Sequence, residues 1–280
     1  MEIRAEDVKA LREKTGAGMM DCKKALGEAS GDFARAEKIL KELGLAAAAK
    51  RGGRATNEGR VFSKVGSGRA AVVELSCETD FVSRNADFVK LGDEIAASIA
   101  GGKAPDAPEL AEKVTGLIAT IKENMALKRA QALEFGASSL VVDYVHGDGR
   151  IAVLVKVSAD KPDALKNEAV KNFAFNCALH IAAFNPLFLS EKDASPEYMK
   201  EQEEIFTKQA ENLGKPAGVL QGIVKGKIKK HLSEVCFLDQ PFVKDDKKPV
   251  KQVLAETGKA AGAELTIDQY IYYRVGEELR

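Results

Sequence analysis

The chain contains Gly66-Ser67-Gly68-Arg69-Ala70-Ala71-Val72-Val73 and, 81 residues later, Gly147-Asp148-Gly149-Arg150-Ile151-Ala152-Val153-Leu154. In each copy a glycine turn leads into an apolar strand, which is typical of a β-hairpin. Apolar residues at helical spacing follow each hairpin, over residues 88–100 and 170–183. The repeat therefore predicts a duplicated α+β core, in which helices cover one face of a small antiparallel sheet in each half.

The residues before the repeat predict a small bundle of three helices. Gly31-Asp32 provides a break and an N-cap before the third helix, and Gly44 stands where a C-cap is expected. The stretch after this helix is basic and rich in glycine, which is typical of a flexible linker. We therefore expect a three-helix bundle over residues 1–50 and a linker over residues 51–58.

Two core subdomains are expected after the linker. The first spans residues 59–137 and ends with a further helix that runs from Pro108 to Leu133. The second spans residues 138–280 and includes a short helix around 250–255 and a strand over 270–275. The predicted fold class is accordingly α+β.

A projecting antiparallel helical hairpin is predicted over residues 195–233, within the second subdomain. Ser195-Pro196-Glu197 combines an N-cap, a first-turn proline and a first-turn acid, so a long helix begins there. This helix has a narrow apolar stripe, and a second helix with a similar stripe is predicted after the turn Gly214-Lys215-Pro216. Two such stripes are typical of helices that pack against each other.

Length and charge limit the possible functions. The chain has 280 residues, and 42 Lys plus Arg balance 42 Asp plus Glu, so no basic field attracts nucleic-acid phosphates. No stretch approaches the roughly 20 apolar residues that a membrane span needs. Met1 leads into a polar segment without the pattern of a signal or transit peptide. We expect a cytoplasmic protein that binds neither nucleic acid nor a membrane.

Residue types that carry metal or catalytic chemistry are scattered along the chain. The four cysteines form no Cys-x-x-Cys pair, and the three histidines lack metal-ligand spacing. Phosphate-loop, nucleophile-elbow and zinc-protease motifs are absent, and the glycine pairs fit hairpin turns better than a phosphate cradle. We therefore expect buried free thiols, no metal site, no cofactor and no enzyme activity.

The segment from Glu78 to Asn85 connects a strand to a helix and contains Thr79-Asp80-Phe81-Val82. Burial of Phe81 in the local core is the interpretation that residue type favours. The alternative is an exposed aromatic wedge for a partner's pocket, because aromatic anchors can dominate the energy of an interface. The residues alone leave both interpretations open.

Met19 and Met20 follow a glycine turn at the start of the second helix. Adjacent residues on a helix cannot both face one core, so one of the two is expected to be exposed. Methionine adapts its shape to irregular surfaces, which suits a docking role. Gap-filling within the bundle is the alternative that the sequence leaves open.

These motifs resemble those of the elongation factor Ts family of the bacterial type. The match runs in order over essentially the whole chain and includes Arg12, Thr15-Gly16-Ala17-Gly18-Met19-Met20-Asp21-Cys22-Lys23-Lys24-Ala25-Leu26, Thr79-Asp80-Phe81-Val82, His146-Gly147 and Gln240-Pro241-Phe242-Val243. The resemblance implies a bundle similar to ubiquitin-associated domains, two related α+β core subdomains and a helical hairpin. It also implies guanine nucleotide exchange on the GTPase elongation factor Tu during translation.

The resemblance implies roles for the segment from Glu78 to Asn85, which we call the core loop. Phe81 would insert beside the partner's nucleotide site, and Asp80 would help to displace the magnesium ion. Thr79 and Val82 belong to the same partner-binding motif. Some family members continue beyond the position of Arg280 into a helical module that also touches the partner, so exchange is expected here to rest on the bundle and the core loop.

The resemblance also implies contact residues outside the core loop. Met19 and Met20 would dock the bundle onto elongation factor Tu. Arg12, Lys23 and His146 are implied as further contacts with the same partner. None of these five residues is expected to take part in bond breaking.

Two other functional hypotheses remain at this stage. One is a scaffold that binds partners through the bundle and the hairpin without any exchange activity. The other is an enzyme, which would require a deep polar pocket with an ordered metal or substrate. The apolar stripes of the hairpin could also pair with a second copy, so a homodimer through the core or the hairpin stays open.

Overall fold

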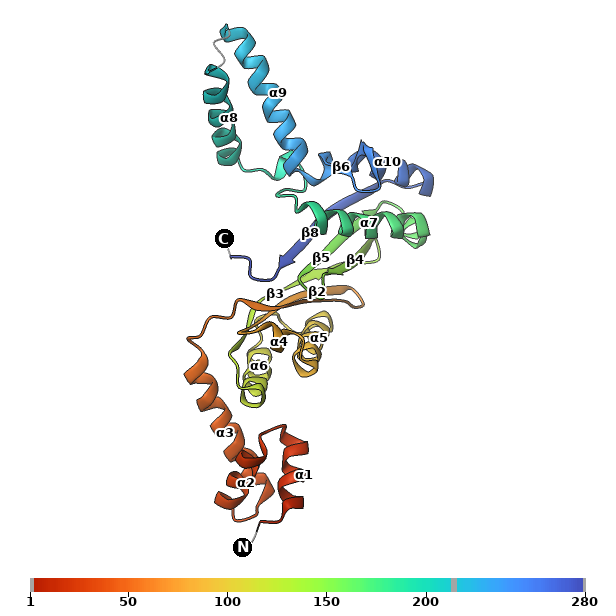
Figure 1. The fold of residues 1–280 in the computed structure, drawn as a ribbon. Coiled ribbons are helices and arrows are strands. Elements are labelled where there is room, and N and C mark those ends of the chain that lie inside the picture. The colour runs from red at the N-terminus through yellow and green to blue at the C-terminus, as the bar shows by residue number, and fades with distance from the viewer. Residues whose placement is uncertain (1–2, 213–215, 279–280) are drawn as a thin grey trace. The chain divides into compact units, whose positions relative to one another are not determined.

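The computed structural model describes residues 3–212 and 216–278. Helices pack on small antiparallel sheets in these residues, which confirms the predicted α+β class (Figure 1). The chain divides into two compact units. Unit 1 is formed by the chain up to Glu134, by Val145–Ala152 and by the segment from Tyr273 on, and unit 2 by Phe135–Tyr144 and Val153–Tyr272.

Three helices form the amino-terminal bundle of unit 1: α1 (Ala5–Thr15), α2 (Met19–Glu28) and α3 (Phe33–Arg51). The Asp32 carboxylate accepts a hydrogen bond from the backbone N–H of Arg35 at 3.0 Å, which confirms the predicted N-cap of α3. The buried apolar residues of the bundle form one cluster, which comprises Val8, Leu11, Cys22, Ala25, Leu26, Ala29, Ala36 and Leu40. The bundle therefore encloses a small core of its own.

The third helix is longer than the sequence predicts. Gly44 is predicted to end it, and this is wrong, because α3 continues through the Ala-rich run to Arg51. A Cβ at Gly44 would overlap the side chain of Ala119 in α6 (Pro108–Ile121). The glycine thus lets α3 and α6 approach closely, and this contact joins the bundle to the rest of unit 1.

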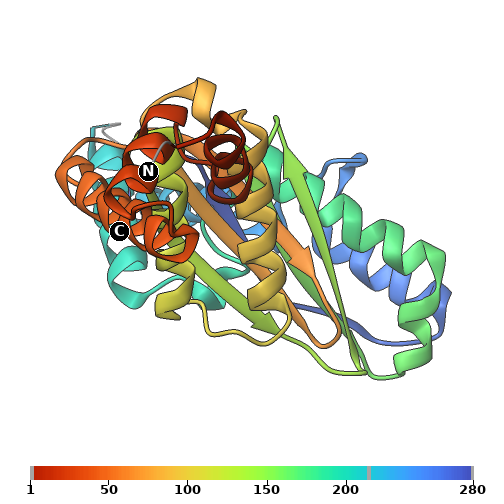
Figure 2. The ribbon, with the colours of Figure 1, turned by 90° about the horizontal axis from the view of Figure 1, so that it is seen from below.

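The first sheet has the strand order β1-β2-β3 and is antiparallel throughout. Its strands are β1 (Glu58–Val65), β2 (Arg69–Cys77) and β3 (Met125–Glu134). The helices α5 (Ala86–Ala100) and α6 lie side by side against it (Figure 2). The core between sheet and helices includes Val73, Leu75, Phe88, Ile95 and Ile99. The predicted first hairpin and the helix after it are confirmed.

The helix predicted from Pro108 to Leu133 is wrong in its second half. α6 ends at Ile121, Lys122 has a left-handed backbone with a φ of 67°, and β3 begins at Met125. The residues of β3 are good helix formers, but pairing with β2 satisfies their backbone groups and buries both ends of the strand. Tertiary pairing therefore overrides local preference here.

The second sheet has the order β4-β5-β8 and is formed by β4 (Ser139–His146), β5 (Ile151–Ala159) and β8 (Leu265–Arg274). In unit 2, α7 (Glu168–Phe184) and α10 (Val250–Ala261) lie side by side (Figure 2). The shorter elements are η1 (Pro162–Lys166), η2 (Glu191–Asp193), η3 (Phe237–Asp239), β6 (Pro241–Phe242) and β7 (Asp245–Pro249). The second predicted hairpin is thus also followed by its predicted helix.

A buried histidine organises the core of unit 2. The Nδ1 atom of His180 accepts a hydrogen bond from the backbone N–H of Val243 at 3.1 Å, so its Nε2–H donates to Oε1 of Gln240 at 2.8 Å. Gln240 in turn donates from Nε2 to the carbonyl of Glu234 at 2.6 Å. Burial lowers the pKa of His180, against a smaller opposing effect of the Gln240 bond. The neutral imidazole therefore fits this network.

The helical hairpin consists of α8 (Pro196–Glu211) and α9 (Ala217–Val235), which pack against each other. Ser195 accepts a hydrogen bond from the backbone N–H of Tyr198, which confirms the predicted cap. The Tyr198 hydroxyl lies 2.7 Å from Nε2 of His231 and so ties the two helices together. Of the predicted turn, Gly214 and Lys215 lie outside the described residues, as does Leu213 of the first apolar stripe.

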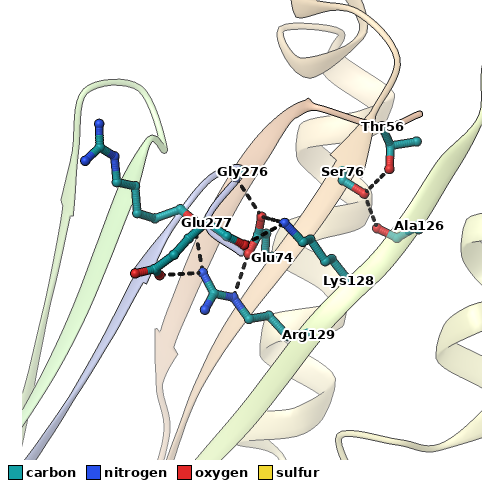
Figure 3. Close-up of polar contacts among 9 residues, drawn as sticks. Thr56, Glu74, Ser76, Ala126, Lys128, Arg129, Gly276 and Glu277 are labelled. Atoms are coloured by element: carbon teal, nitrogen blue, oxygen red, sulfur yellow. Dashed lines mark hydrogen bonds and ion pairs between the residues drawn. The ribbon is translucent and has the colours of Figure 1, made fainter. Parts of the chain in front are cut away.

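An ionic cluster in unit 1 fixes the segment after β8 (Figure 3). The fully buried Glu74 of β2 accepts a 2.6 Å bond from Nε of Arg129 and a 3.0 Å bond from the backbone N–H of Gly276. Lys128 lies 3.5 Å from the same carboxylate, and Arg129 also pairs with Glu277 at 3.2 Å. The Arg129 guanidinium stacks over the Tyr273 ring at 4.0 Å. The buried charge is therefore balanced and fully hydrogen-bonded.

Candidate partner-binding site

The core loop is built from capped turns rather than from extended chain. Thr79 is the N-cap of the short helix α4 (Asp80–Ser83), and its hydroxyl accepts a hydrogen bond from the backbone N–H of Val82 at 3.4 Å. The Ser83 hydroxyl donates to the carbonyl of Asp80 at 2.8 Å. Asn85 then caps α5 by accepting bonds from the first residues of that helix. These local bonds give the loop a defined shape.

Phe81 points into solvent. Its side chain is 83% exposed, so the burial that residue type favoured is wrong and the alternative, exposure, is what the structure has. Val82 and Ser83 are buried beside it, and Val82 belongs to the core under α5. The neighbours of Phe81 thus anchor the turn, while the aromatic ring is left as its outermost apolar group.

Asp80 lies next to Phe81 at the start of the same turn. Its carboxylate pairs with Arg84 at 3.6 Å; the Arg84 side chain is 70% exposed and the Asp80 side chain is 45% exposed. An exposed pair one helical turn apart contributes little and breaks readily, because water competes for both charges. The carboxylate is therefore available for another cation.

The turn after α6 holds the core loop in place through hydrogen bonds. The Glu123 carboxylate accepts hydrogen bonds from the Thr79 hydroxyl at 2.9 Å and from the Thr79 backbone N–H at 3.2 Å. The backbone N–H of Asn124 donates to Glu78 at 2.6 Å, and this bond is the main cause of the lowered pKa of Glu78. Arg54 also pairs with Glu78 at 3.3 Å. Sequence reasoning missed Glu123 and Asn124, because no motif marks residues that act only as supports.

Met19 and Met20 are both exposed. Met19 is 54% and Met20 is 75% exposed, whereas only one of the two was expected to be. They occupy the first turn of α2, where the helix has only begun to face the bundle core, and Cys22 is the first residue of α2 to be buried. Arg12 on α1 and Lys23 on α2 are exposed as well. The apolar pair therefore stands on the surface among charged side chains.

The structure links the bundle to the core loop, whereas His146 lies on a different sheet. Within unit 1, Asp21, next to Met20, pairs with Lys122 at 3.1 Å, and Lys122 directly precedes the Glu123 that holds Thr79. The bundle and the core loop are thus joined through one turn. His146 is exposed at the end of β4, which belongs to the other sheet.

Among the residues that the structure describes, no group of three or more His, Cys, Asp or Glu side chains could hold a metal ion. The four cysteines are free and buried, as predicted. In the same described part of the chain, no helix has the length and the apolar character needed to cross a membrane.

Comparison with known proteins places the chain among translation elongation factors. A family model described as Elongation factor TS matches residues 78–277. An elongation factor Ts from Treponema denticola is 47% identical over 277 residues, covering 99% of both chains. Elongation factors Ts from Treponema pallidum and Borrelia recurrentis are each 44% identical, again over at least 99% of both chains. The chain belongs to the elongation factor Ts family.

Proposed function

We propose that this chain is a guanine nucleotide exchange factor that binds elongation factor Tu with GDP and promotes GDP release, so that GTP can be reloaded during elongation. The observation that carries this proposal is the exposed Phe81 on a hydrogen-bonded turn. An aromatic side chain held in solvent loses little conformational freedom when it enters a pocket, because its turn is already ordered. Family membership is consistent with this function.

The mechanism requires no bond to be broken. A GTPase holds its nucleotide through the diphosphate and a magnesium ion, so disturbing the groups around the metal weakens binding. In this proposal Phe81 inserts beside that site, and Asp80 contributes to displacing the ion. Thr79 caps the turn, and the buried side chain of Val82 anchors it in the core. In this proposal the chain acts on its partner through contacts alone.

The second proposed contact is the surface of the bundle. Met19 and Met20 would dock on the same partner, with Arg12 and Lys23 at their edge and His146 as a separate contact. This docking suits a bundle similar to ubiquitin-associated domains over residues 1–50, followed by the linker 51–58. The proposed core halves are residues 59–137 and 138–280, each with its own sheet.

Linkage sets the energy that the exchange requires. If the factor weakens nucleotide binding, the nucleotide must weaken factor binding by the same free energy. Typical coupling between two sites is roughly 1 to 3 kcal/mol. A nearly complete shift of the partner from the loaded to the open state requires about 5.5 kcal/mol of differential binding. Contacts from both the core loop and the bundle are therefore needed.

Replacement of Phe81 by alanine tests the proposal. We expect Phe81→Ala to slow the release of a fluorescent GDP from elongation factor Tu by at least about tenfold in stopped-flow measurements, because a central aromatic anchor is worth about 2 kcal/mol or more. Leu45→Ala is the matched control, since Leu45 is an exposed apolar residue of α3 with no proposed role. An unchanged release rate with Phe81→Ala would leave a scaffold without exchange activity as the better explanation.

The proposed setting follows from the same function. An exchange factor for an elongation cycle works in the cytoplasm, and its contacts are made to a protein rather than to nucleic acid or to a membrane. Charge balance supports this, since 42 basic and 42 acidic side chains leave no net attraction for phosphates. Self-association through the core or the hairpin is a separate proposal, and sedimentation of the purified chain over a range of concentrations tests it.

A further inference from the structure

The turn at the end of α6 has an unusual backbone. Lys122 is the C-cap of α6 and adopts the left-handed conformation, with a φ of 67°. Residues that have a side chain rarely adopt this conformation, and it persists only where the surroundings hold it. The left-handed step redirects the chain from α6 toward β3. Three residues after Lys122 the chain enters the sheet at Met125.

Three successive residues of this turn contact three different segments of unit 1. Lys122 pairs through Nζ with Asp21 of α2 at 3.1 Å. Glu123 accepts both the hydroxyl and the backbone N–H of Thr79. Asn124, which is buried, donates from Nδ2 to the carbonyl of Arg54 at 2.7 Å, in addition to its backbone bond to the loop. The turn is therefore a common support for the bundle and the core loop.

Glu123 is the member of the turn on which the position of Phe81 depends most. Its two carboxylate oxygens hold both donors of Thr79, and Thr79 caps the four-residue helix that contains Phe81. Hydrogen bonds to an ionised carboxylate are stronger than bonds between neutral groups. Without the carboxylate, the Thr79 N–H loses its acceptor in the turn after α6, and a helix of one turn has few other bonds to maintain it.

We propose that Glu123 is a positioning residue for nucleotide exchange, which holds α4 so that Phe81 is presented in the orientation that the partner GTPase binds. The inference rests on the function proposed above for Phe81. Lys122 has a secondary part, because its pair with Asp21 is about half exposed and such pairs contribute little. Glu123 does not itself touch the partner or the nucleotide in this proposal.

The test measures GDP release from the partner GTPase with the full-length Glu123→Ala and Glu123→Gln variants. We expect Glu123→Ala to lower the maximal release rate at saturating factor by about tenfold, the factor that corresponds to roughly 1.4 kcal/mol. The factor concentration for half-maximal rate should change by no more than about twofold, since the bundle contacts remain. Glu123→Gln keeps one acceptor oxygen and should give an intermediate rate.

A second set of variants identifies the route by which Glu123 acts. If Glu123 acts only by positioning Phe81, Glu123→Ala should cause little further loss in a Phe81→Ala background. An equal loss in both backgrounds would overturn the proposal, and so would a wild-type rate with Glu123→Ala. Glu112→Ala is the matched control, because Glu112 is an exposed carboxylate of α6, the helix that precedes Glu123.

The two proposals fail in different ways. If Phe81→Ala releases GDP at the wild-type rate, the function proposed for Phe81 fails, and this inference fails with it. If Phe81→Ala is slow but Glu123→Ala is fast, only the inference fails. Should Glu123→Ala not fold, the Glu123→Gln variant carries the test alone, and a rate equal to wild type in both Phe81 backgrounds would then overturn the inference.

Discussion

The connector after β2 and the connector after β5 occupy the same place in the two copies of the repeat. They differ in the exposure of their apolar residues to solvent. After β2, the turn α4 presents Phe81, which is 83% exposed. After β5, the turn η1 packs Leu165, which is 7% exposed, into a cluster with Val170 and Leu265. A strand-turn-helix order therefore does not by itself expose an apolar residue of the turn.

The elements on either side of the connectors are alike. Both following helices begin with an asparagine N-cap, Asn85 for α5 and Asn167 for α7. Both helices bury one face, and the buried positions correspond with a constant offset of 82 residues: Phe88 with Val170, Leu91 with Phe173, Ile95 with Cys177 and Ile99 with Ile181. The core helices thus correspond between the copies, whereas the connectors differ, and function is proposed to lie in the first connector.

The largest expected effect separates two phenylalanines that lie seven residues apart. Phe88 is fully buried in the core of unit 1, whereas Phe81 is exposed. Phe88→Ala should lower the free energy of unfolding by about 3 to 5 kcal/mol, because it leaves a cavity. Phe81→Ala should change it by less than about 0.5 kcal/mol. Urea unfolding followed by circular dichroism measures both, and a similar loss in both variants would contradict the contrast.

The next effect concerns a residue that distinguishes β2 from β5. Glu74 is buried in β2, and the corresponding residue of the second copy, 81 positions later, is the buried Val155. Glu74→Val should lower the free energy of unfolding by about 3 kcal/mol, because Arg129 then loses its main partner inside the protein (Figure 3). Thermal and urea unfolding of the variant would measure this loss.

A double variant checks the reason for that loss. Replacing the whole pair, with Glu74→Val and Arg129→Leu together, should recover most of the stability, since no buried charge is left alone. A double variant as unstable as the sum of the two single variants would show that the fold requires the ionic cluster for another reason. The bond from Gly276 to Glu74 is the first alternative to examine.

The smallest expected effect is a pH dependence of the free energy of unfolding that arises from His180 in unit 2. Because burial lowers the pKa of His180 in the folded chain, the unfolded chain binds the proton first. The contribution of His180 is therefore complete above the unfolded pKa of about 6.5 and is lost as pH falls below it. The slope from one such group is at most about 1.4 kcal/mol per pH unit.

The measurement compares wild type with His180→Gln in urea at pH 8, 7, 6 and 5.5, values chosen to span about 6.5. The variant should be less stable at neutral pH but should lose less stability on acidification. The corresponding residue of α5 is Ser98, which bonds to the carbonyl of Glu94 and does not titrate in this range. An equal slope in both proteins would remove His180 as the cause.

Periodicity and turn chemistry predicted most of the architecture. The glycine turns, the alternating strands and the caps at Asp32 and Ser195 are all found in the structure. The error in residues 122–133 has a physical cause. β3 is composed of helix formers, and only its pairing with β2, whose residues lie 48 to 65 positions earlier in the chain, makes it a strand. Gly44 shows the same limit, since its role depends on Ala119 in another helix.

The candidate site was predictable in part. The motif around Phe81 was recognised from sequence, but the exposure of its ring depends on Val82 and Ser83 turning inward, which no local pattern indicates. The exposure of both Met19 and Met20 likewise depends on their place in the first turn of α2. Glu123 is far from the motif along the chain, so its contact with Thr79 becomes visible only in three dimensions.

The burial of all four thiols has a practical consequence. Burial is the main cause that raises the pKa of Cys77 to about 12 and that of Cys236 to about 11, and burial also raises the pKa of Cys177, while Cys22 is enclosed in the bundle. Alkylating dyes react with thiolates that solvent reaches, so the native chain should label slowly. Phe81→Cys would then add an exposed thiol that a maleimide fluorophore labels, and rapid labelling of this variant would report the exposure of position 81 in the native chain.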